Sequence, residues 1–82
     1  MYVQIKITRK GEPNGSAIVR FMERNENLPL HEDVSNNINY NPKVKRQIDL
    51  LLKPKVGELI DVYVKDKSGD FVLLMNCTTE EA

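Results

Sequence analysis

The chain of 82 residues is shorter than a typical domain of about 100 to 150 residues, so we expect one small domain, 1–82, with a single core. Hydrophobic residues make up 40% of the sequence and charged residues 29%, a balance typical of a globular fold rather than a disordered tail. The formal net charge of zero argues against the uniformly cationic surface of a strong non-specific nucleic-acid binder.

Targeting and redox signals are weak. The longest apolar run, 71–75, is far below the roughly 20 residues that cross a bilayer, and residues 1–6 lack the apolar core of a secretory signal. We therefore expect a cytoplasmic protein without a membrane partner. Cys77 is the only cysteine, which excludes an internal disulfide and a cysteine-based metal cluster within one chain.

The zero net charge conceals four blocks of alternating sign. Residues 1–24 carry a net charge of +3 and residues 25–41 carry −3, whereas residues 42–57 carry +4 and residues 58–82 carry −4. These blocks can form a basic face and an acidic face. Alternatively, they can neutralise one another across the fold, since exposed ion pairs are easily arranged and contribute little.

The N-terminal part predicts a β-hairpin. Apolar and polar residues alternate from Val3 to Ile7, the pattern of a strand with one buried face. Turn formers cluster between residues 10 and 15 and include Gly15, which can adopt a positive φ. A second strand, 16–22, follows. Its expected buried residues are Ala17, Val19 and Phe21.

The periodicity fails from Glu23 to Asn41, where six of the chain's eight asparagines occur. We interpret 23–41 as a long Asn-rich loop, part of which packs against the domain or contains a short helical turn around residues 33–37. Loops longer than about 12 to 15 residues are uncommon in compact domains and often bind a partner. If the partner is a protein, the candidate contact residues are Leu30, His31 and Tyr40.

A helix is predicted to begin at Asn41 and Pro42, because asparagine is a good N-cap and proline is tolerated at the first helical position. The pair Lys53-Pro54 ends it. The helix's expected apolar stripe comprises Val44, Ile48, Leu51 and Leu52.

The C-terminal part predicts a second hairpin, with strands at 58–65 and 71–77 and a turn at 66–70. The last strand is apolar on both faces, and a domain of this size has few elements to cover it. We therefore expect a homodimer. The predicted fold class is α+β, in the order β-β-loop-α-β-β with two antiparallel hairpins.

The sequence offers few groups for catalysis. His31 is the only histidine, and Cys77 lies in an apolar strand, where a thiol has a poor thiolate fraction. The glycines form no phosphate-binding loop. We expect no enzyme activity, cofactor, metal site or small-molecule substrate. The aromatic residues are not expected to form the platform of an RNA-binding sheet; Phe21 and Phe71 are assigned to the core.

Several short segments resemble the AbrB/MazE swapped-hairpin family. Thr8-Arg9-Lys10-Gly11 resembles its T-x-K-G turn, and Pro42-Lys43-Val44-Lys45-Arg46 resembles its P-K-x-x-R helix start. Members are homodimers of interleaved hairpins that act as DNA-binding regulators or as antitoxins. The resemblance implies a homodimer and places DNA contacts at four positions: Arg9, Lys10, Lys43 and Arg46.

Two functional hypotheses follow. The first is a dimeric DNA-binding regulator or antitoxin-like module, which the basic first hairpin favours because a two-stranded ribbon fits the major groove. The second is a small inhibitor or adaptor of the kind that phages and other mobile elements encode. Such a protein would bind a host protein through the loop 23–41 and a strand edge, and the zero net charge favours it.

Overall fold

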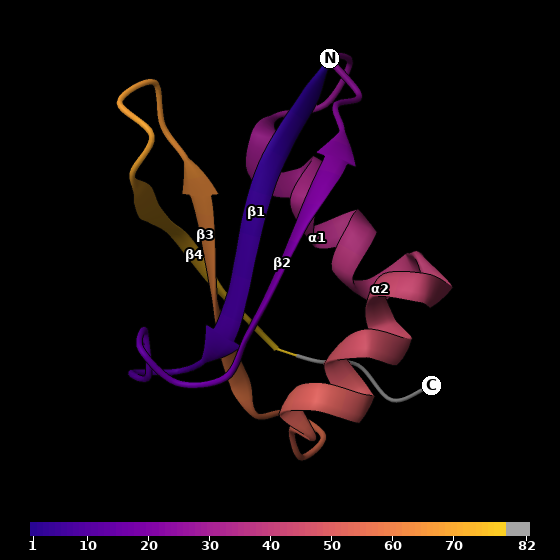
Figure 1. Cartoon of the computed structure of the whole chain (residues 1–82). Coiled ribbons are helices and arrows are strands. Elements are labelled where there is room, and N and C mark those ends of the chain that lie inside the picture. Colours follow the sequence, from indigo (N-terminus) through magenta and orange to yellow (C-terminus); the bar gives the residue numbers. More distant parts are fainter. Residues whose placement is uncertain (79–82) are drawn as a thin grey trace.

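The computed structural model, which describes residues 1–78, is a four-stranded antiparallel sheet with helices packed on one face (Figure 1). The elements in chain order are β1 (Tyr2–Arg9), β2 (Ala17–Glu23), α1 (Leu30–Tyr40), α2 (Pro42–Gln47), the π-helical turn η1 (Ile48–Leu52), β3 (Leu59–Lys65) and β4 (Phe71–Thr78). The strand order is β2-β1-β3-β4, so β2 and β4 form the edges. The predicted α+β class with two antiparallel hairpins is confirmed.

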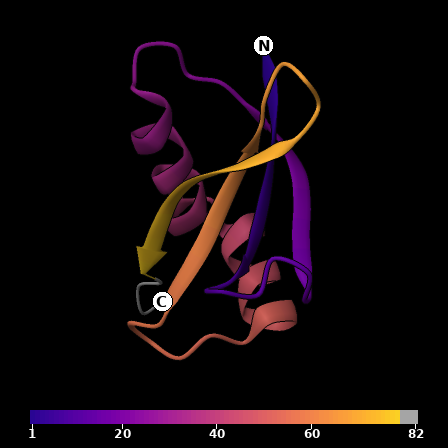
Figure 2. The ribbon, with the colours of Figure 1, turned by 90° about the vertical axis from the view of Figure 1, so that its left-hand side faces the viewer.

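The hydrophobic core lies between the sheet and the helices, which run along one side of the strands (Figure 2). Burying each aliphatic side chain stabilises the fold by about 1.5 to 3 kcal/mol. The core residues are Ile5, Ile7, Ile18, Met22, Val34, Ile38, Val44, Ile48, Leu52, Ile60 and Val62. The alternation predicted for the first strand is confirmed, because Ile5 and Ile7 both have 0% exposure.

The second strand turns the opposite face to the core from the one predicted. Ile18 and Met22 are buried, and Phe21 pairs with Gln4 on the side away from the helices. Directly paired residues share a face, so this register places every second residue of β2 outside the core. The residues wrongly assigned to the core are Ala17, Val19 and Phe21.

The predicted Asn-rich loop 23–41 is wrong over most of its length, because residues 30–40 form α1. Val34 and Ile38, one helical turn apart, are fully buried against the sheet. Asparagine is a weak helix former. The helix is therefore stabilised by the packing of this apolar stripe rather than by intrinsic propensity.

A buried ion pair fixes the segment that leads into α1. Arg24 Nη1 lies 2.6 Å from Asp33 Oδ2, and both side chains are largely buried. The same carboxylate oxygen accepts a hydrogen bond from the Asn25 amide at 2.8 Å, while Arg24 Nη2 donates to the Leu28 carbonyl at 3.3 Å. These bonds hold residues 24–28 against the first turn of the helix.

The start of α2 is as predicted. The Asn41 side chain accepts a hydrogen bond from the Lys43 amide at 3.1 Å, and Pro42 is the first helical residue. This cap satisfies one of the amides that a helix start leaves without a backbone partner.

The end of this helical segment departs from the prediction because its last turn, η1, is π-helical. A π turn is wider than an α turn, so it shifts the phase of the side chains that follow. Ile48 and Leu52 stay buried, but Leu51 is 59% exposed, and its assignment to the apolar stripe was wrong. Lys53 ends the segment in the left-handed region, with φ 49° and ψ 48°.

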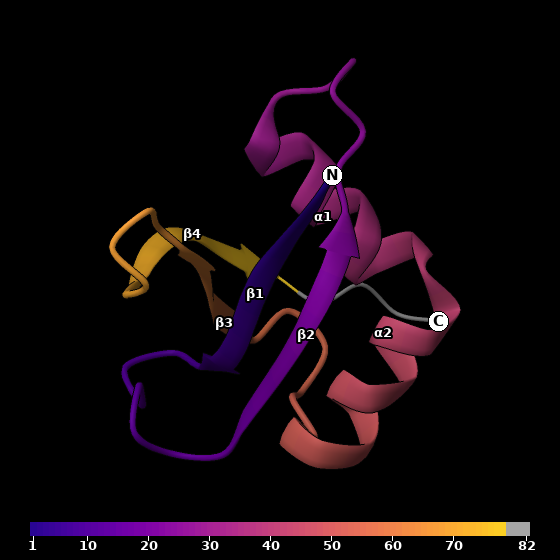
Figure 3. The same cartoon turned by 45° about the horizontal axis from the view of Figure 1, so that its top comes forward.

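The second hairpin has one irregularity. β4 pairs with β3 along its length, but Leu74 is an extra residue between Leu73, which pairs with Tyr63, and Met75, which pairs with Val62. This bulge breaks the strict alternation of faces along β4. β4 lies at the edge of the sheet opposite β2, which runs beside the α2 segment (Figure 3).

Candidate functional site

The face of the sheet that carries no helix, here called the open face, presents two rows of side chains that cross all four strands. The first row comprises Val19, Lys6, Tyr63 and Leu73. The second row comprises Phe21, Gln4, Lys65 and Phe71. The rows combine three aromatic rings with two ammonium groups and one amide.

Lys6 lies at the centre of this arrangement. Its ammonium nitrogen is 5.3 Å from the centroid of the Tyr63 ring and 5.7 Å from that of Phe71. Lys65 approaches the Phe71 ring to 5.5 Å and donates a hydrogen bond to Gln4 Oε1 at 3.1 Å. The contacts hold both cations beside the half-buried rings, whose electron density attracts them.

The sequence pattern did not predict that the aromatic residues of the open face lie on the same side of the sheet. Phe21 is 66% exposed, so its assignment to the core was wrong. Tyr63 and Phe71 are half-buried and approach Lys6 from β3 and β4, which both lie on the same side of β1. A group of aromatic and basic side chains, here called the platform, thus lies on this face of the sheet. It requires the pairing of β1 with β3, which no local pattern reveals.

One end of the open face is closed by the β1–β2 turn. Asp61 is 6% exposed and accepts hydrogen bonds from the Gly11 amide at 3.0 Å and from the Asn76 side-chain amide. Gly11 has φ 75°, so the turn's positive φ occurs there and not at Gly15. These amides supply hydrogen bonds to both oxygens of the buried carboxylate, which lies outside the two rows, so the charged groups of the rows are cationic only.

The other end of the open face borders the β3–β4 turn, which contains two carboxylates. A hydrogen bond from the Ser68 hydroxyl, at 2.6 Å, is the main cause that lowers the pKa of Asp66; the Asp70 amide donates a second bond at 3.0 Å. Asp70 also accepts from the Ser68 hydroxyl at 3.2 Å. The acidic side chains beside the platform are thus held within their own turn.

The four DNA-contact candidates lie outside the open face. Arg9 is bound internally: it pairs with Glu58 at 2.9 Å and with Glu12 at 3.4 Å, and it donates to the Leu52 carbonyl at 3.0 Å. The other three candidates are exposed, one in the first turn and two on α2: Lys10, Lys43 and Arg46. The structure thus gives Arg9 a role in tying β1 to the end of η1.

The three protein-contact candidates are separated along α1. Leu30 begins the helix and packs against the core, while the exposed His31 follows it. Tyr40, 69% exposed, ends the helix about 15 Å away, given a rise of about 1.5 Å per residue. The structure does not bring the three together on one surface.

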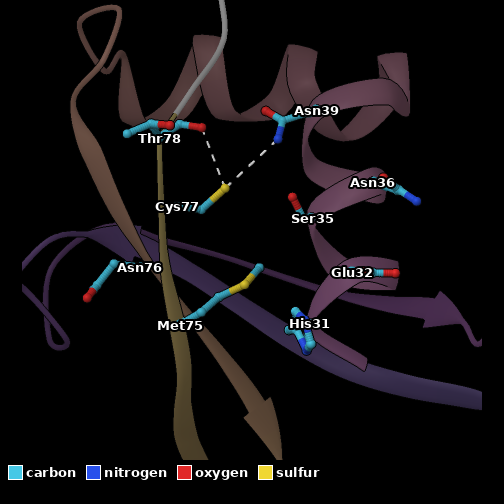
Figure 4. A pocket seen from close by; sticks show the side chains of 9 residues that line it. All are labelled: His31, Glu32, Ser35, Asn36, Asn39, Met75, Asn76, Cys77 and Thr78. Atoms are coloured by element: carbon cyan, nitrogen blue, oxygen red, sulfur yellow. Dashed lines mark hydrogen bonds between the residues drawn. The ribbon is translucent and has the colours of Figure 1, made fainter. Parts of the chain in front are cut away.

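His31 lies instead in an open groove of about 570 Å³ between α1 and β4 (Figure 4). Cys77 lies in the same groove, where its Sγ accepts a long hydrogen bond of 3.9 Å from Asn39 Nδ2 and donates to the Thr78 carbonyl at 3.5 Å. Since Asn39 is two helical turns from His31, the imidazole is about 12 Å along the helix from the group that contacts the thiol. This arrangement does not form a cysteine–histidine pair.

Within residues 1–78, no group of three or more histidine, cysteine, aspartate or glutamate side chains is placed to hold a metal ion. No helix among these residues is long and apolar enough to span a membrane. Comparisons with protein-family models, curated protein sequences and solved structures give no significant match to this chain. The open face is therefore its main candidate site on physical grounds.

Proposed function

We propose that this chain is a non-catalytic regulatory domain that binds single-stranded nucleic acid on the open face of its sheet. The observation that carries the proposal is the position of the Lys6 ammonium group beside the rings of both Tyr63 and Phe71. Nucleobases stack on exposed aromatic rings, and lysines beside those rings neutralise the phosphates that connect the bases.

The geometry favours a single strand over a duplex. The bases of a duplex are stacked on one another, so aromatic rings that lie on the face of a sheet have no base to contact. An unpaired base can lie on Tyr63 or Phe71, and each stacked base contributes about 1 to 3 kcal/mol of binding free energy. The phosphates then reach Lys6 and Lys65, and the Gln4 amide is placed beside the same track.

The proposal retains a nucleic-acid partner but moves the contact surface. The resemblance places the contacts at Arg9 and Lys10 and on α2, whereas the open face uses a different set of cations on the side of the sheet away from α2. Zero net charge is compatible with such a site, because a stacking platform needs a local cationic track rather than a uniformly basic surface.

Fluorescence anisotropy with labelled oligonucleotides tests the proposal. Single-stranded DNA, single-stranded RNA and the corresponding duplex are titrated with the protein at low and at moderate salt. We expect a single strand to bind more tightly than the duplex, with an affinity that falls as salt rises. The DNA and RNA arms identify which strand is preferred. Equal or tighter binding of the duplex would contradict the proposal that single strands bind on the open face.

A matched pair of variants decides between the two surfaces. Lys6→Gln and Arg46→Gln each remove one positive charge, the first from the open face and the second from α2. We expect Lys6→Gln to weaken single-strand binding several-fold and Arg46→Gln to leave it nearly unchanged. The reverse order would favour the surface that the family resemblance implies.

Recognition of a protein partner is the second candidate, and a separate observation favours it. Three of the most exposed apolar side chains lie close together in sequence, on η1 and the link to β3: Leu50, Leu51 and Val56, at 60%, 59% and 70%. Exposed apolar side chains that gather into a contiguous patch mark protein contacts. A double variant, Leu50→Ser with Leu51→Ser, would abolish capture of a protein partner and leave oligonucleotide binding intact.

A further inference from the structure

The edge strand β4 lacks the usual protection against pairing. Its eight residues, Phe71–Thr78, include no charged residue, proline or glycine. Val72 and Leu73 remain 44% and 55% exposed. The outer N–H and C=O groups of an edge strand recruit another strand unless charges, prolines or a covering segment prevent it. The composition of β4 is therefore that of a strand with a partner.

The opposite edge strand, β2, carries charged residues and has the helical layer beside it. β2 carries Arg20 near its centre and Glu23 at its end, and it runs beside the helical layer (Figure 3). Arg20 Nη1 donates a hydrogen bond to Gln47 Oε1 at 2.5 Å, which places a charged side chain and α2 next to this edge. At β4, an open groove separates the strand from α1 (Figure 4). Strand addition is therefore favoured at β4.

The bulge at Leu74 determines which strand fits this edge. Before the bulge, odd-numbered residues of β4 face the open side, because Leu73 pairs with Tyr63; after it, even-numbered residues do, because Asn76 pairs with Asp61. The open-face residues of β4 are thus Phe71, Leu73, Asn76 and Thr78.

A second β4 in antiparallel orientation matches this pattern along its whole length. With a two-fold axis between Leu74 and Met75, the pairs of the open face are Phe71 with Thr78 and Leu73 with Asn76. On the core face, Val72 pairs with Cys77. Without the extra residue, the same full-length alignment would place open-face residues opposite core-face residues. The uncharged strand also brings no like charges together at the axis.

From this match we infer that two copies of the chain join through β4 and form one continuous eight-stranded antiparallel sheet. The interface is isologous, as in most homodimers. Both helical layers lie on one side of the joined sheet, and both open faces lie on the other. The partner of β4 is therefore a second copy of this chain.

The dimer extends the proposed binding surface. This consequence rests on the proposed function, whereas the dimer itself does not. At a strand spacing of about 4.8 Å, the two copies of β3 lie roughly 14 Å apart across the seam. A single strand of several nucleotides then engages Lys6 and Tyr63 of both copies, and the second contact is intramolecular. A strand long enough to span both platforms should bind more tightly than one that covers a single platform.

A site-specific disulfide tests the interface without nucleic acid. In the inferred pairing, Val72 of one copy lies opposite Cys77 of the other, at a Cα separation that a disulfide can bridge. We expect Val72→Cys, treated with diamide as the oxidant, to form covalent dimers. The double variant Val72→Cys with Cys77→Ser removes the partner thiol and should not form them, nor should the wild-type chain.

Two further measurements complete the test. Sedimentation of the wild-type chain at micromolar concentration should give twice the monomer mass of 9.4 kDa. The β2 variant Val19→Cys should give no covalent dimer. A monomer mass, or cross-linking through Val19 instead of Val72, would overturn the inference. Since no oligonucleotide is present, these outcomes are independent of whether the open face binds nucleic acid.

Discussion

The Lys6 ammonium nitrogen lies 5.3 Å from the centroid of the Tyr63 ring, directly across the pairing of β1 with β3. A cation–aromatic contact at an exposed site contributes only about 0.5 to 1 kcal/mol to stability. Removing it should therefore leave the fold largely intact. The relationship matters for ligand binding, because it fixes a positive charge beside a ring on the side of the sheet that the protein's own helices leave uncovered.

The helical packing predicts a sharp difference between two residues of the same turn. Ile48→Ala should reduce the free energy of unfolding by about 2 to 5 kcal/mol, because it empties a buried site. Leu51→Ala removes a similar volume from an exposed position, so its cost should be below about 0.5 kcal/mol. Urea denaturation of both variants measures the difference. Equal losses of unfolding free energy for the two variants would contradict the side-chain positions that the π-helical turn η1 gives to Ile48 and Leu51.

The ion pair between Arg24 and Asp33, in the first turn of α1, predicts a large loss of stability for Asp33→Ala. The substitution leaves the guanidinium of Arg24, 15% exposed, without its carboxylate and should cost about 3 to 5 kcal/mol. The neighbouring Glu32 is exposed, and Glu32→Ala should change stability by less than about 0.5 kcal/mol. Thermal denaturation of the two variants provides the comparison, and a small loss for Asp33→Ala would contradict a buried role.

The backbone at the end of η1 predicts a stabilising substitution. Lys53 adopts φ 49° and ψ 48°, a conformation that costs a residue with a Cβ atom about 1 to 2 kcal/mol. Lys53→Gly should therefore raise the free energy of unfolding, by up to about 1 kcal/mol after the greater flexibility of glycine in the unfolded chain is included. A loss of stability would show that the lysine side chain makes a contact that outweighs the strain.

The β3–β4 turn predicts a measurable titration. Ser68→Ala removes the hydrogen bond that contributes most to the lowered pKa of Asp66, so this pKa should rise toward its ordinary value. A lowered pKa stabilises the folded chain above the unfolded-state pKa, and that contribution is lost as the pH falls through the folded-state pKa. NMR titration of the Asp66 carboxyl group measures the shift. An unchanged pKa would assign the effect to the backbone donors.

Local chemistry in the sequence predicted much of the fold. The alternation from Val3 to Ile7, the cap at Asn41 and the turn at 66–70 each depend on neighbouring residues, and the structure has all three. Helix α1 was missed because its many asparagines outweighed a visible stripe of apolar residues four apart: Leu30, Val34 and Ile38. Packing against the sheet overrides their weak propensity.

The candidate site was not predictable in the same way. Phe21 and Met22 are both apolar neighbours on one strand, and only the pairing register decides which of them faces the core. The contact between Lys6 and Tyr63 joins residues that are distant in sequence and meet through the pairing of β1 with β3. The π-helical turn that exposes Leu51 likewise leaves no local signal.

Chemical-shift mapping by NMR tests the central claim most directly. A single-stranded oligonucleotide is titrated into isotopically labelled protein, and the shift of every assigned amide is followed. We expect the largest changes at Lys6, Tyr63 and Phe71, with little change at Lys43 and Arg46 on the helical side. Changes confined to the helical side, or no saturable change at any residue, would contradict binding at the open face.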